Sequence, residues 1–131
     1  APINLAWARD NRTAGIRIPI SEPQARRVEN RIAGMDCNPY LGIAVSLACG
    51  YLGMKNELRP SKQYRGDAYE GREDLPRGMG EALGLFEDAS ELHEILGSEF
   101  TRVYSIVKRA EYDEFLQVIS PWEREHLLLN V

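Results

Sequence analysis

Arginine and glutamate side chains near the start of the chain have types and spacing that phosphoryl-transfer chemistry can use. Arg12 and Arg17 are five residues apart, and Glu29 and Arg31 follow after a turn. Guanidinium groups bind carboxylates and phosphates through paired hydrogen bonds, and a carboxylate is a common ligand of a hard cation such as Mg²⁺. These residues indicate a clamp in which arginines offset the charge of a transferring phosphoryl group. The alternative interpretation is a pair of surface salt bridges, each worth less than about 1 kcal/mol.

Two short strands are the elements that must position these groups. Apolar residues alternate over 16–20, so Arg17 points to the opposite face of a half-buried strand. Residues 26–32 alternate again, and they place Glu29 and Arg31 on one polar face. If the two strands pair as a hairpin, Arg17 converges with this polar face and several fixed cations surround one carboxylate.

The remaining elements predict an α+β fold. Residues 3–9 form a further predicted strand, so antiparallel strands are expected over about 3–32. Asn38-Pro39 is a typical helix start. Residues 40–54 contain one polar side chain, Ser46, which predicts a buried core helix over 38–58. Its apolar run of about 15 residues is shorter than the roughly 20 that span a bilayer. A long polar loop covers 59–77, and its length is typical of a functional segment, a mobile segment or one packed on a neighbour. Further helices are expected at about 79–87, 89–96, 98–118 and 121–128, and strands followed by helices define the α+β class.

Composition and charge exclude several classes of function. The 131 residues are 44% hydrophobic and 27% charged, which is typical of a globular domain. The net charge is −4, yet the first 31 residues contain six arginines, three acidic residues and no lysine. A basic segment of this kind in an acidic protein favours a small anionic ligand over nucleic acid. The two cysteines are too few for a disulfide framework or a metal quartet, so reduced thiols in a cytoplasmic protein are expected.

Three motifs resemble the C-terminal part of the glutamine synthetase family in their order and spacing. They are Asn-Arg-Thr-Ala-Gly-Ile-Arg-Ile-Pro at 11–19, Arg-Arg-Val-Glu-Asn-Arg at 26–31, and Asp-Cys-Asn-Pro-Tyr-Leu at 36–41. Each motif alone is weak, but the combination is specific. The resemblance spans essentially the whole chain. It implies that residues 1–131 are the C-terminal segment of a longer catalytic domain, with most of the metal ligands upstream.

The resemblance implies an enzyme that uses ATP and Mg²⁺ or Mn²⁺ to phosphorylate the side-chain carboxylate of glutamate. Ammonia or a small amine then displaces phosphate and forms an amide. By motif, Arg12 resembles the residue that contacts both the nucleotide phosphate and glutamate, and Arg17 a ligand of the ATP phosphates. Glu29 resembles a metal ligand and Arg31 a ligand of glutamate. The family often has a nucleotide-contacting Lys before the paired arginines of the second motif, and here Gln24 takes that place.

Two features resemble the γ-glutamyl-polyamine and putrescine branch of the family: Trp7, and Val-Glu-Asn-Arg at 28–31. The family resemblance also implies a homo-oligomer, commonly a dodecamer with active sites between subunits, and no nucleic-acid or membrane partner. The isolated chain is expected to be inactive. The alternative is a non-catalytic relative used for assembly or ligand sensing, and intact metal ligands upstream would distinguish the enzyme from it.

Weaker patterns have structural explanations. The glycine-rich stretch at 78–84 does not follow a strand, and a helix start near Gly80 is predicted instead. His93 and His126 have no second ligand four residues away, so both are predicted to be surface residues. Tyr69 sits near where some bacterial relatives carry a nucleotidylated tyrosine, but its surroundings do not match that motif well.

Overall fold

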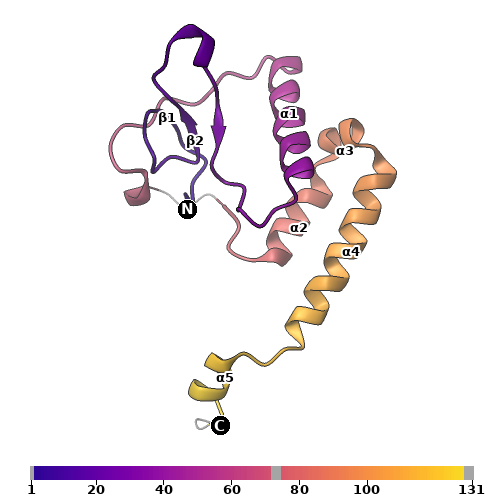
Figure 1. Ribbon diagram of the computed structural model, residues 1–131. Coiled ribbons are helices and arrows are strands. Elements are labelled where there is room, and N and C mark those ends of the chain that lie inside the picture. Colours follow the sequence, from indigo (N-terminus) through magenta and orange to yellow (C-terminus); the bar gives the residue numbers. More distant parts are fainter. Residues whose placement is uncertain (1, 72–74, 129–131) are drawn as a thin grey trace. The chain divides into compact units, whose positions relative to one another are not determined.

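The computed structural model describes residues 2–71 and 75–128, and strands precede helices in it as the sequence predicts (Figure 1). The chain divides into two units, Ala1–Pro76 with a sheet and one long helix, and Arg77–Val131 with helices. This order confirms the α+β class. The candidate chemical residues all lie in the first unit.

Three short strands form one sheet in the order β1-β2-β3. They are β1 (Trp7–Arg9), β2 (Ile16–Ile18) and β3 (Glu29–Asn30). β2 and β3 are antiparallel, with Arg17 opposite Glu29. β1 and β2 are parallel, with Ala8 opposite Arg17. The expectation of antiparallel strands is therefore correct for β2 and β3 and wrong for β1.

The connection between β1 and β2 explains the parallel pairing. The buried side chain of Asn4 donates to the Thr13 carbonyl at 3.1 Å and accepts from the Gly15 amide at 3.1 Å. These bonds fold residues 10–15 back against the segment that precedes β1. Consequently the Ile16 amide donates to the Ala6 carbonyl at 3.0 Å, and β2 begins beside the start of β1.

The long helix α1 (Pro39–Lys55) begins as predicted, and its large apolar side chains are exposed within this chain. The Asn38 side chain accepts from the Tyr40 amide at 3.0 Å, and Pro39 occupies the first turn. The sequence predicts a core helix that 131 residues can hardly cover, and within this chain Ala48 is the one buried residue of α1. A helix that is apolar all round needs cover on every side, and a sheet of three short strands is too small to supply it. The large apolar side chains exposed on α1 are Tyr40, Ile43, Leu47, Tyr51 and Met54.

The predicted loop after α1 lies along the N-terminal segment. The Trp7 indole donates to the Ser61 carbonyl at 2.6 Å, and the Tyr64 amide donates to the Trp7 carbonyl at 3.0 Å. A short 3₁₀ turn, η2 (Ala68–Glu70), follows. The part of this loop over 61–71, called the strap below, therefore packs on its own chain.

The second unit contains α2 (Met79–Asp88), α3 (Ser90–Leu96), α4 (Ser98–Leu116) and α5 (Pro121–His126). α2 and α3 both pack on α4. The helix start expected near Gly80 is confirmed, since Gly78 is the N-cap of α2. No helix in the part of the chain that the structure describes is long and apolar enough to cross a membrane.

Gly15→Ala is expected to destabilise the first unit by about 3 kcal/mol, at the upper end of what overpacking costs. A Cβ at this position would lie 2.1 Å from the backbone oxygen of Asn4, so the backbone would have to move. The measurement is urea unfolding. The matched control is Gly50→Ala in α1, where a Cβ meets nothing within 4 Å, and which should stabilise by about 0.5–1 kcal/mol. Equal stability of the two variants would contradict the close approach at Gly15.

Candidate functional site

Arg17 lies at the centre of an ion-pair network on the sheet. Its Nη1 donates to Glu29 Oε2 at 2.9 Å, and its Nη2 pairs with Asp10. Arg27 Nε donates to the other carboxylate oxygen of Glu29 at 3.0 Å. The convergence predicted for Arg17 and Glu29 is confirmed, and it follows from their cross-strand pairing. Only 15% of the Arg17 side chain and 26% of the Glu29 side chain are exposed, which reduces screening by solvent.

These contacts fix the charge of the network. The hydrogen bond from Arg17 holds the pKa of the Glu29 carboxyl below its usual range, and Arg27 acts in the same direction. Hydrogen bonds to Glu29 and Asp10 raise the pKa of Arg17. Glu29 is therefore an anion at neutral pH, and it presents the ionised oxygens that a hard cation prefers.

Two buried guanidinium nitrogens of this unit have no hydrogen-bond partner among the residues that the structure describes. They are Arg17 Nε and Arg31 Nε, and the Ser21 hydroxyl oxygen is unpaired in the same sense. The Arg31 backbone amide donates to the Gly15 carbonyl at 2.9 Å, which holds this residue next to β2. Buried N–H groups are almost always satisfied, so oxygens of a bound phosphate or carboxylate fit these two atoms.

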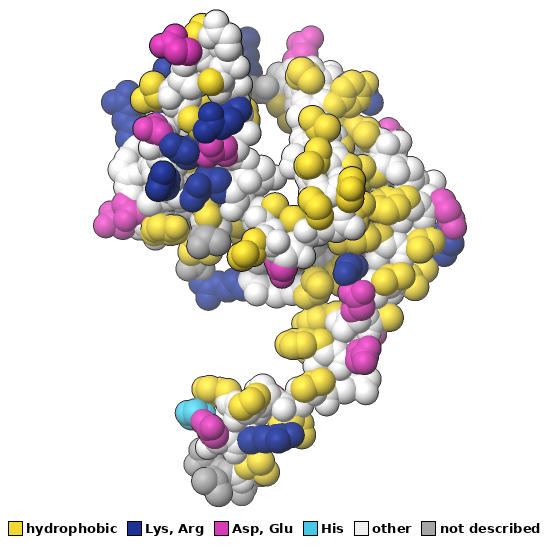
Figure 2. Space-filling view, in the orientation of Figure 1, with side chains coloured by type: hydrophobic (Ala, Val, Ile, Leu, Met, Phe, Trp, Pro, Cys, Tyr) yellow, Lys and Arg dark blue, Asp and Glu magenta, His cyan; other side chains and the backbone are white. Residues whose placement is uncertain are grey.

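Arg12 and Gln24 lie outside the ion-pair network of Arg17 and Glu29. Arg12 lies in the 10–15 connection, and its guanidinium is exposed with no hydrogen bond or ion pair to any residue the structure describes. Gln24 lies in the 3₁₀ turn η1 (Pro23–Ala25), is exposed, and likewise has no side-chain partner among residues 2–71 and 75–128. The structure joins Arg17 with Glu29 and links neither Arg12 nor Gln24 to them. Figure 2 shows basic side chains interspersed with acidic ones over this unit.

Three residues that build or support the candidate site were not identified from the sequence. Arg27 shares the polar face with Glu29 in the alternating pattern, so its role could have been inferred. Asp10 has a left-handed backbone (φ 48°), a conformation that Asp tolerates better than most residues, and no sequence pattern marks it. Asn4 is 2% exposed. The one sequence feature that could have indicated its burial is that it is a single amide side chain within an apolar stretch.

A metal ion needs more ligands than the described residues of this unit supply. Glu29 is the candidate ligand, and carboxylate chemistry suits Mg²⁺ or Mn²⁺. Among the residues described here, no group of three His, Cys, Asp or Glu side chains could hold a metal ion. Cys37 and Cys49 are both free thiols, as expected.

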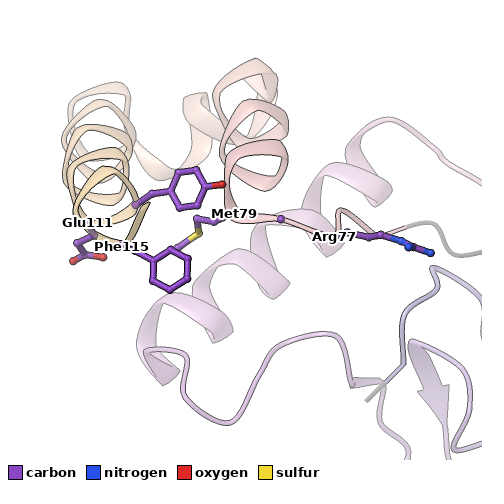
Figure 3. A pocket seen from close by; sticks show the side chains of 6 residues that line it. Arg77, Met79, Glu111 and Phe115 are labelled. Atoms are coloured by element: carbon purple, nitrogen blue, oxygen red, sulfur yellow. The ribbon is translucent and has the colours of Figure 1, made fainter. Parts of the chain in front are cut away.

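A pocket of about 510 Å³ lies within the helical unit, between the start of α2 and the C-terminal half of α4. Met79, Tyr112 and Phe115 form most of its wall, and Figure 3 shows Arg77 directed away from Met79 and Phe115. The pocket is mainly apolar and gathers no set of convergent polar groups, so it is not the candidate site.

Glu29→Gln is expected to destabilise the chain more at about pH 7 than at about pH 3, because a depressed carboxyl pKa contributes stability only where the carboxyl is ionised. The folded-state pKa of Glu29 lies below its unfolded value. This contribution is therefore complete above the unfolded pKa and is lost as the pH falls through the folded one. The measurement is urea unfolding of both proteins at the two pH values. A difference in unfolding free energy that does not change with pH would contradict the ion pair.

Comparison with known proteins gives a consistent match. Residues 1–127 match the family model described as glutamine synthetase, catalytic domain. The chain is 33% identical to a glutamine synthetase of Methanocaldococcus jannaschii, with 98% of the chain and 30% of the relative covered. It is 38% identical to a glutamate–isopropylamine ligase of a Pseudomonas species, with 92% and 27% covered. It is 37% identical to a γ-glutamylputrescine synthetase of Escherichia coli, with 98% and 28% covered. The chain thus spans about 30% of the length of these curated relatives.

Proposed function

The chain belongs to the glutamine synthetase catalytic-domain family, and we propose that it forms the C-terminal segment of an ATP-dependent ligase that joins glutamate to ammonia or a small amine. In this reaction a γ-carboxylate oxygen of glutamate attacks the terminal phosphorus of ATP, and ADP leaves. The amine nitrogen then attacks the acyl carbon and loses a proton, and phosphate leaves. The product is a γ-glutamyl amide.

One observation carries this proposal: the Nε atoms of Arg17 and Arg31 are buried and unpaired among the described residues, and Arg17 also pairs with the ionised carboxylate of Glu29. Both reactants are anions, so the first step brings like charges together. Fixed guanidinium groups offset that repulsion. β2 holds the backbone of Arg17, and the bond from the Arg31 amide to the Gly15 carbonyl holds the backbone of Arg31 next to β2. A surface salt bridge would need no spare donors, so the unpaired Nε atoms favour a ligand site.

Each residue has a proposed part in this chemistry. Arg17 binds the phosphates of ATP, and Arg31 binds the carboxylate of glutamate. Arg12, whose guanidinium has no partner among the residues described, reaches both the nucleotide phosphate and glutamate. Gln24 contacts the nucleotide. Glu29 is one ligand of Mg²⁺ or Mn²⁺, and the metal supplies positive charge that offsets the phosphates.

The acceptor is proposed from two local features. The relatives named glutamine synthetase, glutamate–isopropylamine ligase and γ-glutamylputrescine synthetase match this chain at similar identity, 33–38%. Trp7, which is anchored to the Ser61 carbonyl, and Val-Glu-Asn-Arg at 28–31 support an amine such as putrescine. The second candidate function is a non-catalytic relative used for assembly or ligand sensing. Retention of the Glu29 carboxylate disfavours it, because a protein without catalysis has no need of a metal ligand.

The test is an assay of the full-length protein with ATP, Mg²⁺, glutamate and a panel of ammonia, putrescine and isopropylamine. We expect ADP release that depends on both glutamate and one of the amines, with the γ-glutamyl amide identified by mass spectrometry. Binding of ATP and glutamate without any ADP release, while Mg²⁺ or Mn²⁺ is present, would favour the non-catalytic alternative. The family also supports a homo-oligomer as the assembled form, which sedimentation of the same sample would test.

Arg31→Lys in the full-length protein should raise KM for glutamate by about tenfold or more, although the charge is kept, because an ammonium cannot rebuild a paired guanidinium–carboxylate contact. The measurement is steady-state kinetics with glutamate varied. The matched control is Arg102→Lys on α4, where Arg102 pairs with Glu99 at 2.7 Å on an exposed surface. That control should leave KM unchanged. Wild-type kinetics in Arg31→Lys would place Arg31 outside the site.

A further inference from the structure

Asn4 has every hydrogen-bonding position of its side chain in use. Its Oδ1 accepts from the amides of Ala6 and Gly15, both at 3.1 Å. Its Nδ2 donates to the carbonyls of Thr13 at 3.1 Å and Ala68 at 3.2 Å. An amide side chain can make four such bonds. A buried side chain that satisfies all of them specifies one arrangement of the three segments it joins.

The three segments are the N-terminal stretch, the 10–15 connection and the strap. A second set of bonds ties the last two together. The Thr13 hydroxyl oxygen accepts from the Ala68 amide at 2.8 Å, and the Asn11 side chain donates to the Gly66 carbonyl at 2.8 Å. The 10–15 connection is thus held on one side by Asn4 and on the other by the strap.

Arg12 lies between these anchored positions. Its neighbours Asn11 and Thr13 are both fixed, and the Asn11 side chain also accepts from the Thr13 amide at 2.9 Å. The Arg12 guanidinium has no partner of its own in the part of the chain that the structure describes, so its place depends on the backbone that carries it. An arginine on a mobile loop would lose side-chain rotamer freedom and backbone freedom on binding an anion. A backbone that is already fixed removes the cost in backbone freedom.

We propose that Asn4 is a positioning residue that holds the Arg12 turn against the strap and thereby sets the affinity for ATP and glutamate. This inference rests on the proposed function, because it acts through the proposed contact of Arg12 with the substrates. It concerns Arg12 and not the metal ligand, because the Glu29 carboxylate is held by Arg17 and Arg27 and the Asn4 side chain bonds to none of these three residues. Loss of Asn4 should therefore raise the KM values and leave the response to metal unchanged.

The test uses Asn4→Leu in the full-length protein, a change that keeps the number and branching of the side-chain heavy atoms and removes all four bonds. We expect KM for ATP and for glutamate to rise by about tenfold or more, with an unchanged Mg²⁺ activation curve. Hydrogen exchange should lose protection in peptides covering 12–16 and 65–70. Asn4→Asp serves as a second variant if Asn4→Leu does not fold. It keeps the oxygen acceptor and sets a carboxylate oxygen against the Thr13 and Ala68 carbonyls, so the same KM values should rise.

A double-mutant cycle decides whether the effect passes through Arg12. Arg12→Gln should raise KM for ATP, and Asn4→Leu added to Arg12→Gln should raise it no further. The matched control is Thr101→Val in α4, where a side chain 1% exposed donates to the Ser98 carbonyl at 3.0 Å. It should lower thermal stability without changing either KM.

The outcomes separate the two proposals. An unchanged KM in Arg12→Gln would overturn the proposed contact of Arg12 with the nucleotide. A raised KM in Arg12→Gln with an unchanged KM in Asn4→Leu and in Asn4→Asp would overturn the positioning role alone. The positioning role would also be overturned if the increases in KM for ATP of the two single variants multiplied in the double variant, because Asn4 would then act independently of Arg12.

Discussion

Glu29→Gln in the full-length protein is expected to lower kcat by about 100-fold and to shift metal activation to higher Mg²⁺ concentration. Replacing residues that only support metal ligands already costs about 10–100-fold in affinity or activity, and Glu29 is proposed as a ligand itself. Its carboxylate is ionised because Arg17 and Arg27 both donate to it. The neutral amide of Gln keeps a similar shape and loses the charge that holds the cation, so positive charge opposite the phosphates is lost as well.

The matched control for this prediction is Glu87→Gln. Glu87 also accepts from an arginine, with Arg109 Nε at 2.8 Å, and Arg109 lowers its pKa in the same way. It lies on α2 in the helical unit, and it is none of the residues proposed to bind a substrate or the metal. Glu87→Gln should therefore leave kcat and the metal activation curve unchanged. An Mg²⁺ curve for Glu29→Gln that matches the unmodified protein would remove Glu29 from the metal site.

The convergence of Arg17 and Glu29 could be predicted because it depends on alternation along single strands. Residues 16–20 and 26–32 alternate, which places Arg17 and Glu29 each on the polar face of its strand. The pairing of β2 with β3 then sets Arg17 opposite Glu29. The start of α1 was equally local, since Asn38 and Pro39 carry the helix-start signal in their own side chains. Local signals of this kind need no knowledge of distant segments.

Non-local features could not be predicted in the same way. The parallel pairing of β1 and β2 depends on how Asn4 ties Thr13 and Gly15, and hydrogen bonds of one side chain leave no periodic pattern. The strap was expected as a loop, but its attachment to residues 7–13 spans more than 50 positions in the chain. The exposure of α1 also depends on what surrounds it, because an apolar sequence predicts a need for cover and does not say which residues supply it.

The exposed surface of α1 bears on how the isolated chain should behave. Tyr40, Ile43, Leu47, Tyr51 and Met54 are all more than half exposed. Large contiguous apolar surfaces of this kind favour association. The isolated chain is therefore expected to self-associate, which sedimentation at increasing concentration would detect. A monodisperse monomer at all concentrations would contradict this expectation.

The isolated 131-residue chain is also expected to show no ligase activity above background. Among the residues described, Glu29 is the one carboxylate matched to a metal-ligand role, and no group of three possible ligands is present. A single protein carboxylate seldom holds Mg²⁺ against water, since the ion retains its hydration unless several oxygens replace it. Without further walls around the site, an acyl phosphate would be open to hydrolysis. The arginines should still bind anions, so ATP binding without turnover is the expected result.

The measurement is release of ADP from ATP by the isolated 131-residue chain with glutamate, Mg²⁺ and either ammonia or putrescine. The full-length protein is the control. ATP binding is followed in parallel by calorimetry, and Arg17→Met identifies the part of that binding due to the proposed phosphate contact. Weak ATP binding that Arg17→Met reduces, together with background ADP release, would support an incomplete site whose arginines are already in place. Amine-dependent ADP release near that of the full-length protein would instead mean that these residues alone complete the site. The proposal that further metal ligands lie elsewhere in the protein would then be wrong, because one carboxylate would have sufficed for phosphoryl transfer.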